Sequence, residues 1–346
     1  MKFDGVICHD ELRKNITPYL SYDENTDFND YKEKIREKLI ELLGIERIKE
    51  NSCPLKIDIV EKKQKDGYEQ IRFEFESEKN CYVPCYLLIP DCKKKKYPVA
   101  IVLQGHNESG FHSSIGNVLR EERRDYDAGR GMFAVQAVKA GFVALAVEMR
   151  GRGERTAITT FDRRVNIHPL PGECYYEAMT AIMLGRTLIG ERVYDISRAI
   201  DALEFFPECD MDNIVITGNS GGGTASFYTA CYDERIKLCA PSCAFCTYDE
   251  SIMKYYHCSC NYLPQAYLWF DMPDLTCLIS PRKLAIVAGE YDTGFKIEGV
   301  LKGYETVKKV FKNAGVEENC SLTVNKAGHL WVEEVMWNII RREIGC

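Results

Sequence analysis

The stretch IVITGNSGGGTA, residues 214–225, decides how this chain is interpreted. A run of apolar, mostly β-branched residues ends there, and four of the next six residues are glycine, with Ser220 among them. The pattern Gly218-x-Ser220-x-Gly222 between a strand and a helix-compatible stretch is typical of a sharp turn that strains the serine backbone and exposes its hydroxyl. Because that turn needs small neighbours, the glycines favour a nucleophile over a turn that only packs a helix closely onto a strand.

Around this stretch, continuous apolar runs alternate with helical patterns. The predicted strands are residues 99–103, 142–147, 214–217, 238–241, 284–288 and 322–324, and the predicted helices are residues 134–140, 175–206, 221–232, 300–314 and 332–344. Apolar strands that alternate with helices predict a mostly parallel sheet covered on both faces, which is a doubly wound α/β fold.

The pattern before residue 98 is different. Residues 27–43 carry apolar side chains at helical spacing, and Gly44 ends the segment. Three alternating runs follow, which predict antiparallel strands at residues 55–61, 69–75 and 82–89. We therefore expect a helical extension over residues 1–50 and one α/β domain over residues 51–346, into which the antiparallel strands lead.

A serine nucleophile needs a base and an acid, and in enzymes with such a turn the order along the chain is Ser, acid, His. His329 follows the last predicted strand and precedes the last helix, whereas His257 precedes the candidate acids. Asp292 and Glu290 both follow the strand at residues 284–288. Asp292 lies further into the loop and is the preferred acid, while Glu290 remains the alternative or a supporting residue.

An acyl transfer also needs donors for the oxyanion. The backbone N–H of Gly221, directly after the nucleophile, is the first expected donor. Gln104, Gly105 and His106 follow the first parallel strand, and the N–H of His106 is the second expected donor. The side chain of His106 could instead face the substrate, and Gln104 and Gly105 could contact the substrate or support the loop.

In this order the motifs resemble the α/β-hydrolase superfamily, and within it acetyl-xylan-esterase-like and dienelactone-hydrolase-like serine esterases. The motifs that carry the resemblance are Gln104-Gly105-His106, MRGRGER at residues 149–155, GNSGG at 218–222, SPR at 280–282, Gly289-x-x-Asp292 and Gly328-His329. The resemblance implies a carboxylesterase for short acyl groups such as acetyl, on a carbohydrate, with a Ser220-His329-Asp292 triad, an acyl-enzyme and no cofactor. Many relatives have histidine where Gln104 stands, at a position that supports the loop.

Two further segments have alternative interpretations. Arg150 lies in the motif at residues 149–155, where it could form an internal ion pair with Glu148 or Glu154, or bind an acidic or sugar substrate. Tyr262 and Trp269 belong to an aromatic-rich segment that could line a sugar or acyl pocket. The same segment could equally be a cap packed on the core.

The chain has sixteen cysteines, an unusually high number. Without a signal sequence, free thiols in a reducing compartment are the expectation. One group could hold zinc, namely Cys239, Cys243, Cys246, His257, Cys258 and Cys260. Its spacing contains no second Cys-x-x-Cys pair, so no metal is predicted.

The net charge of −7 gives no reason to expect nucleic acid or an anionic membrane as a partner. The chain has neither a signal-like N-terminus nor a long apolar run, so we expect a cytoplasmic protein. The expected partner is a small-molecule or oligosaccharide ester as substrate. A homo-oligomer is compatible with the sequence. The alternatives are a peptidase or amidase with the same triad, and a non-catalytic binding protein of the same fold. The acyl length, the alcohol part and the oligomeric state stay open.

Overall fold

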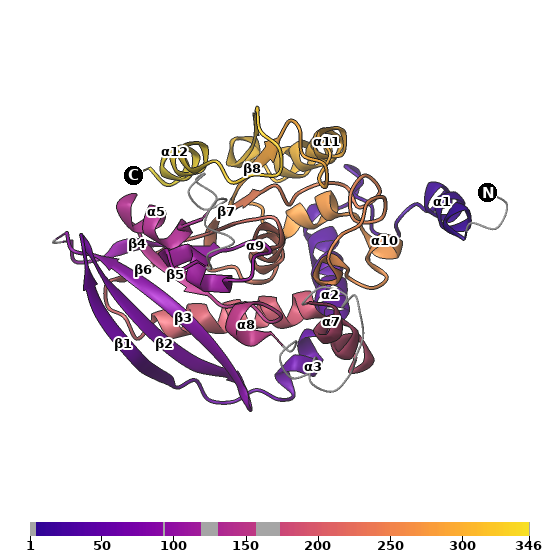
Figure 1. The fold of residues 1–346 in the computed structure, drawn as a ribbon. Helices are drawn as coiled ribbons and strands as arrows, with labels where there is room; N and C mark the ends of the chain where they lie inside the picture. The colour runs from indigo at the N-terminus through magenta and orange to yellow at the C-terminus, as the bar shows by residue number, and fades with distance from the viewer. Residues whose placement is uncertain (1–4, 93, 119–130, 157–173, 346) are drawn as a thin grey trace.

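A nine-stranded sheet runs through the protein in the order β1-β2-β3-β5-β4-β6-β7-β8-β9 (Figure 1). The computed structural model describes residues 5–92, 94–118, 131–156 and 174–345. The first three strands are antiparallel: β1 (Ile57–Lys65), β2 (Tyr68–Glu78) and β3 (Cys81–Pro90). β3 also pairs antiparallel with β5 (Val143–Val147). The remaining pairs are parallel and add β4 (Tyr97–Leu103), β6 (Cys209–Asn219), β7 (Ile236–Ser242), β8 (Lys283–Gly289) and β9 (Cys320–Asn325).

Helices cover both faces of this sheet, as β4 illustrates. Val99, Ile101 and Leu103 belong to one buried cluster, whereas Ala100 and Val102 belong to the other, because successive side chains of a strand point to opposite faces. The first face is covered by α2 (Phe28–Leu43), α3 (Ile45–Lys49), α8 (Leu188–Leu203), α9 (Gly221–Tyr232) and α11 (Ile297–Asn313). The second face is covered by α5 (Phe133–Lys139) and α12 (Glu333–Ile344). The predicted doubly wound α/β fold is confirmed.

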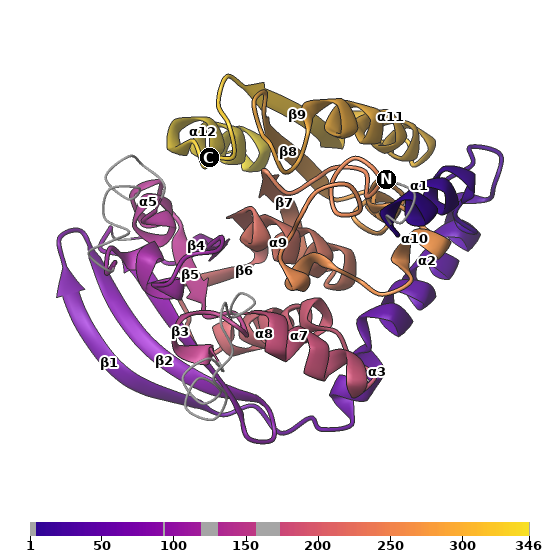
Figure 2. The same cartoon turned by 45° about the vertical axis from the view of Figure 1, so that its right-hand side comes forward.

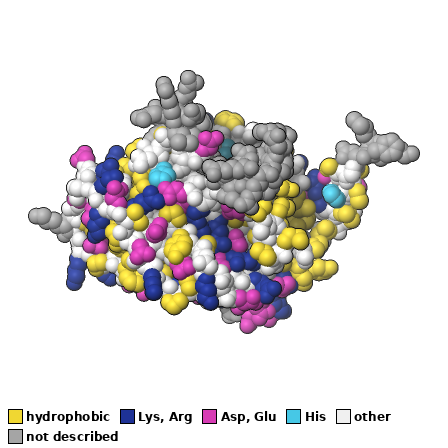
Figure 3. Space-filling view, turned by 60° about the horizontal axis from the view of Figure 1, so that its bottom comes forward, with side chains coloured by type: hydrophobic (Ala, Val, Ile, Leu, Met, Phe, Trp, Pro, Cys, Tyr) yellow, Lys and Arg dark blue, Asp and Glu magenta, His cyan; other side chains and the backbone are white. Residues whose placement is uncertain are grey.

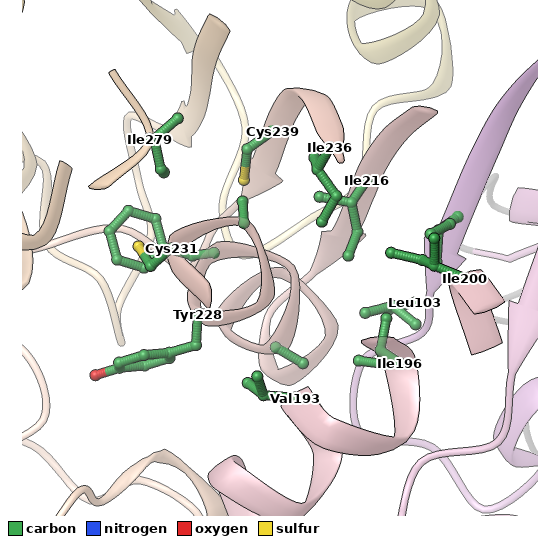
Figure 4. Packing of buried hydrophobic residues seen from close by; sticks show 14 of the residues in the cluster. Leu103, Val193, Ile196, Ile200, Ile216, Tyr228, Cys231, Ile236, Cys239 and Ile279 are labelled. Atoms are coloured by element: carbon green, nitrogen blue, oxygen red, sulfur yellow. The ribbon is translucent and has the colours of Figure 1, made fainter. Parts of the chain in front are cut away.

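The helix that follows Ser220 lies in the middle of the first layer. α9 is buried over nearly its whole length, and Figure 4 shows it among apolar side chains of β4, β6, β7 and α8. Leu103, Ile216 and Val193 are fully buried there. This packing fixes α9 to the sheet and therefore fixes the turn from which it starts.

The predicted helix over residues 175–206 is wrong as a single element. The chain forms α7 (Cys174–Met183) and then α8, which lie side by side in Figure 2. Gly185 between them has a φ of 71°, which a continuing helix does not allow. Thr187 then caps α8 by accepting a hydrogen bond from the N–H of Gly190.

The N-terminal helices share the main core. Asp27 caps α2, and Gly44 ends it with a φ of 75°, in agreement with the predicted stop. Ile35 and Leu39 of α2 are buried in the same cluster as α8 and α9. The division at residue 50 stays a prediction, and the described part of the first 50 residues adds to the core of the α/β unit.

The remaining helices are short or peripheral. They are α1 (Val6–Asn15), α10 (Ala266–Trp269), η1 (Gly110–Ile115), η3 (Gly153–Arg155), η4 (Ser259–Asn261), η5 (Met272–Leu278) and η6 (Glu317–Asn319). Within the described ranges, no helix combines the length and the apolar character needed to cross a bilayer. Positive and negative side chains are interspersed over the face seen in Figure 3.

Candidate active site

Ser220 occupies a strained turn between β6 and α9. Its φ of 55° and ψ of −125° lie in a region that residues other than glycine rarely adopt. A Cβ on Gly218 would stand 2.4 Å from the carbonyl oxygen of Leu103, and one on Gly222 would stand 2.1 Å from the same atom. Both glycines are therefore required by the close approach of β4, and the turn has the geometry predicted for a nucleophile.

His329 and Asp292 form an acid–base pair at the carboxyl ends of β8 and β9. Nδ1 of His329 lies 2.8 Å from Oδ2 of Asp292. Burial alone would raise the pKa of Asp292, but the hydrogen bond from His329 and the N–H groups of Phe295 and Gly294 lower it below its usual value. With Nδ1 engaged, Nε2 is the ring nitrogen left to accept a proton from a nucleophile.

Glu290, the alternative acid, is exposed, and its backbone N–H donates to the carbonyl oxygen of Asn325. The structure therefore brings Asp292, and not Glu290, to the imidazole. The difference arises because Oδ1 of Asp292 accepts hydrogen bonds from the N–H groups of Gly294 and Phe295, at 2.8 and 3.0 Å, which turn its side chain into the loop.

The neighbouring strand β7 connects the serine to this pair. The N–H of Ser220 donates to the carbonyl oxygen of Ser242 at 2.9 Å. The thiol of the next residue, Cys243, lies within 4.8 Å of a carboxylate oxygen of Asp292 and of a ring nitrogen of His329. In the described part of the chain no hydrogen bond joins the side chains of Ser220 and His329, and such contacts often tighten only when substrate binds.

Gln104, Gly105 and His106 lie beside the nucleophile. A Cβ on Gly105 would stand 3.1 Å from the carbonyl oxygen of Asn219 and 3.4 Å from Cβ of Ser220. The ring of His106 lies against Gly221, the first residue of α9, whose N–H has no acceptor within the helix. The two residues expected to supply oxyanion donors thus adjoin each other at Ser220.

Glu148 supports this loop and was not predicted to do so. Gln104 is buried, and its Nε2 donates to Oε1 of Glu148 at 3.2 Å. The carboxyl group of Glu148 also accepts hydrogen bonds from the backbone N–H groups of Phe111 and Glu154. Burial raises the pKa of Glu148 to about 8, and those two N–H groups oppose the rise.

Arg150 belongs to a buried ion-pair network. Its guanidinium contacts Glu78, Asp195 at 2.8 Å and Glu191 at 3.3 Å. The predicted internal ion pair therefore exists, but its expected partners, Glu148 and Glu154, were wrong. The carboxylates come from β2 and α8, whose pairing with the 149–155 motif cannot be recognised from neighbouring sequence.

The aromatic segment divides between two roles. The ring of Trp269 lies 5.2 Å from that of Tyr19, and Nζ of Lys38 lies 3.8 Å above it. Trp269 therefore packs against the N-terminal segment, as a cap would. Tyr262 instead lines a cavity of about 270 Å³ together with Tyr175, Met179, Tyr256, His257, Cys258 and Ser259.

That cavity adjoins the loop of the acid. Nε2 of His257 lies 3.2 Å from the carbonyl oxygen of Gly294, and its ring contacts Phe295 edge-on. Phe295 in turn stacks on His329, with 6.0 Å between the ring centroids and 9° between the planes. The cavity is therefore the candidate pocket for a group of the substrate.

The structure separates the group of residues at 239–260 that could have held zinc by its spacing. All cysteines in the described ranges have free thiols. Cys239 donates to the carbonyl oxygen of Ser226, Cys246 to that of Lys296, and Cys243 to that of Leu330. Only Cys258 and Cys260 of that group converge, and they do so on His106 and on Cys174, a residue far upstream.

Comparisons with known proteins agree with this architecture. A model of the Abhydrolase family matches residues 5–312. The "Putative hydrolase YtaP" of Bacillus subtilis (strain 168) is 24% identical over 262 residues, which cover 75% of this chain and 81% of that protein.

Solved structures are similar over nearly the whole chain. A "putative acetyl xylan esterase" from Bacteroides fragilis NCTC 9343 superposes with a TM-score of 0.75 at 17% identity, covering 99% of this chain and 89% of the other. A glucuronoyl esterase from Solibacter usitatus superposes with a TM-score of 0.63 at 14% identity, covering 95% and 99%. These likenesses concern the fold.

Proposed function

Because the chain belongs to the Abhydrolase family, we propose that it is a serine esterase that hydrolyses carboxylic esters of carbohydrates, with acetyl esters as the first candidates. The observation that carries the proposal is the strained backbone of Ser220, at φ 55° and ψ −125°, which β7 links to the hydrogen-bonded pair of His329 and Asp292. Strain of this kind at a serine is typical of a nucleophile held for attack.

In the proposed mechanism Oγ of Ser220 attacks the ester carbonyl while Nε2 of His329 takes its proton. Asp292 holds Nδ1–H, which fixes the tautomer and stabilises the imidazolium that forms. The N–H groups of Gly221 and His106 would bind the oxyanion of the tetrahedral intermediate. His329 then returns the proton to the leaving alcohol, and a water molecule repeats the sequence to release the acid from Ser220.

The carbohydrate part of the proposal draws on the names of the similar structures, an acetyl xylan esterase and a glucuronoyl esterase. The two names imply different ester bonds: in the first the acid part is an acetyl group, and in the second it is a uronic acid. The cavity of about 270 Å³ beside His257 and Tyr262 is large enough for a small acyl or sugar group. We therefore place the acyl group of the substrate near this cavity.

The test is the hydrolysis of p-nitrophenyl acetate by the wild type and by Ser220→Ala. The loss of the nucleophile should lower kcat/KM by about 10⁴- to 10⁶-fold. Ser226→Ala is the matched control, because Ser226 is buried in the same helix and donates only to the carbonyl oxygen of Gly222. Equal activity of Ser220→Ala and the wild type would refute the assignment.

A second experiment addresses the substrate class. Acetylated xylo-oligosaccharides and glucuronoyl esters are compared at equal concentration with the wild-type enzyme. A kcat/KM for the acetylated sugar above that for p-nitrophenyl acetate would support acetyl specificity on a carbohydrate. Preference for the glucuronoyl ester would reassign the ester bond while keeping the serine mechanism.

A further inference from the structure

Four side chains with metal-binding atoms converge beside the predicted oxyanion loop. They are His106 after β4, Cys174 at the start of α7, and Cys258 and Cys260 around η4, and their ligand atoms all lie within 4.8 Å of one another. Nε2 of His106 lies 3.2 Å from Sγ of Cys260. Cys174 and Cys260 are buried, and Cys258 is half-buried. The four residues come from three segments that are far apart in the sequence.

We propose that His106, Cys174, Cys258 and Cys260 form a structural Zn²⁺ site. Tetrahedral zinc binds thiolate sulfur at about 2.3 Å and histidine nitrogen at about 2.0–2.1 Å, which places neighbouring ligand atoms about 3.6–3.8 Å apart. The four ligand atoms lie within 4.8 Å of one another, and the 3.2 Å between Nε2 of His106 and Sγ of Cys260 is somewhat shorter than this separation, so small side-chain movements would admit a metal ion. One histidine and three cysteines are among the standard ligand sets of structural zinc.

The charge around the cluster also fits a metal ion. Three thiolates and one Zn²⁺ leave a single negative charge. Arg192 is 1% exposed, and its Nη2 donates to Sγ of Cys174 at 3.2 Å. The same guanidinium donates to the carbonyl oxygen of Arg150, which fixes its direction. A buried cation held against a sulfur atom is the outer partner that a negatively charged zinc–thiolate centre requires.

Two other clusters of potential ligands do not compete with this assignment. In the first, Asp195 lies near Glu78 and Cys81, but Arg150 and Arg155 already neutralise it. In the second, Cys243 lies near the hydrogen-bonded pair of Asp292 and His329. Among the described residues, only the cluster around His106 combines four ligands with a soft, sulfur-rich composition.

The site would be closed, because all four positions of a tetrahedron are taken by side chains, and a closed site stabilises structure rather than activating water. It would tie the loop after β4 and the segment around η4 to the start of α7. It would also hold the ring of His106 against Gly221. This consequence for catalysis rests on the proposed function, whereas the metal site itself does not.

The first experiment measures metals in the full-length chain, prepared without a histidine tag and under reducing conditions. Plasma mass spectrometry should find about one zinc per chain. The protein is then made with Co²⁺ in place of zinc, and the visible spectrum should show the intense bands of tetrahedral, thiolate-bound cobalt. Substoichiometric metal after reduction and incubation with Zn²⁺, or a disulfide between two of the three cysteines, would overturn the proposal.

Variants assign the ligands. Cys260→Ser is compared with Cys246→Ser, since both thiols are buried, and Cys258→Ser with Cys53→Ser, since both are half-buried. The Cys258 and Cys260 variants should bind zinc at least about 10-fold more weakly, and the controls should keep it. Equal retention of zinc in all four variants would refute the site.

Should a ligand variant fail to fold, the metal content and the cobalt spectrum of the wild type still decide the question. Ser220→Ala separates the two proposals, because it should keep zinc while it loses esterase activity. Zinc in a protein without esterase activity would refute only the proposed function. Esterase activity in a chain that binds no zinc would refute only the metal site.

Discussion

The imidazole of His106 lies directly against the Cα of Gly221: a Cβ on Gly221 would stand 2.6 Å from Cε1 and 2.9 Å from Nδ1 of that ring. Gly221→Ala keeps the backbone N–H but must displace the ring of His106. We expect this to shift the loop that carries the N–H of His106. We expect kcat for p-nitrophenyl acetate to fall by about 10²- to 10³-fold, the cost of losing one oxyanion donor.

The double variant His106→Ala/Gly221→Ala tests whether the fall in kcat of Gly221→Ala is caused by its clash with His106. In the His106→Ala background the extra methyl group has room, so Gly221→Ala should have a much smaller effect on kcat than in the wild type. Multiplicative losses in the double variant would show that the two residues act independently. Circular dichroism of all three variants provides the control for folding.

Asp292→Asn should lower kcat by about 10⁴-fold, because the amide no longer holds the imidazole of His329 in the tautomer that accepts the serine proton. The matched control is Glu290→Gln, in the same loop, which should leave kcat within a few-fold of the wild type. Steady-state kinetics with p-nitrophenyl acetate measures both. A large loss of kcat in Glu290→Gln, together with an active Asp292→Asn, would show that Glu290 and not Asp292 is the acid of the triad.

Arg150→Met should destabilise the fold without altering substrate affinity. The change leaves the buried carboxylates Glu78 and Asp195 with fewer cationic partners, a loss that costs about 3–5 kcal/mol of unfolding free energy. Arg47→Met removes an exposed pair with Glu50 and should cost only about 0–1 kcal/mol. Urea denaturation gives both values. A raised KM with unchanged stability would instead place Arg150 in substrate binding.

Glu148 makes the stability of the protein depend on pH. Its pKa is about 8 in the folded chain against a usual 4.5, because of burial. Below about pH 4.5 both the folded and the unfolded chain hold the proton. From there to about pH 8 only the folded chain holds it, so the free energy of unfolding falls as the pH rises, and above about pH 8 the difference stays constant.

Glu148→Gln mimics the protonated acid and should remove this dependence. As the pH rises from about 5 to about 8, the free energy of unfolding of the variant should increase relative to that of the wild type by on the order of a few kcal/mol. Chemical denaturation at a series of pH values measures the difference. Parallel stability curves for the two proteins would show that Glu148 is ionised in the folded chain at neutral pH.

The sequence predicted the sheet, the turn at Ser220 and the loops of Asp292 and His329, because each depends on residues close together in the chain. Apolar runs and glycine positions set those local features. The partners of Arg150, the location of Trp269 and the meeting of Cys174 with Cys260 were not predictable in this way. They depend on side chains from segments that only the completed fold brings together.

The N-terminal segment has a further consequence, for the order in which the protein is completed during synthesis. The N–H of Tyr22 donates a hydrogen bond to Asp274 at 2.9 Å, and the hydroxyl of Tyr22 accepts one from Asn313. Nζ of Lys32 donates to the carbonyl oxygen of Ser280. These partners leave the ribosome late. The packing of α2 and of the segment before it is therefore completed only late in translation, although α8 and α9 are made earlier, and nascent chains with incomplete packing are prone to aggregate. The first helix of the core thus gains its last partners near the end of synthesis.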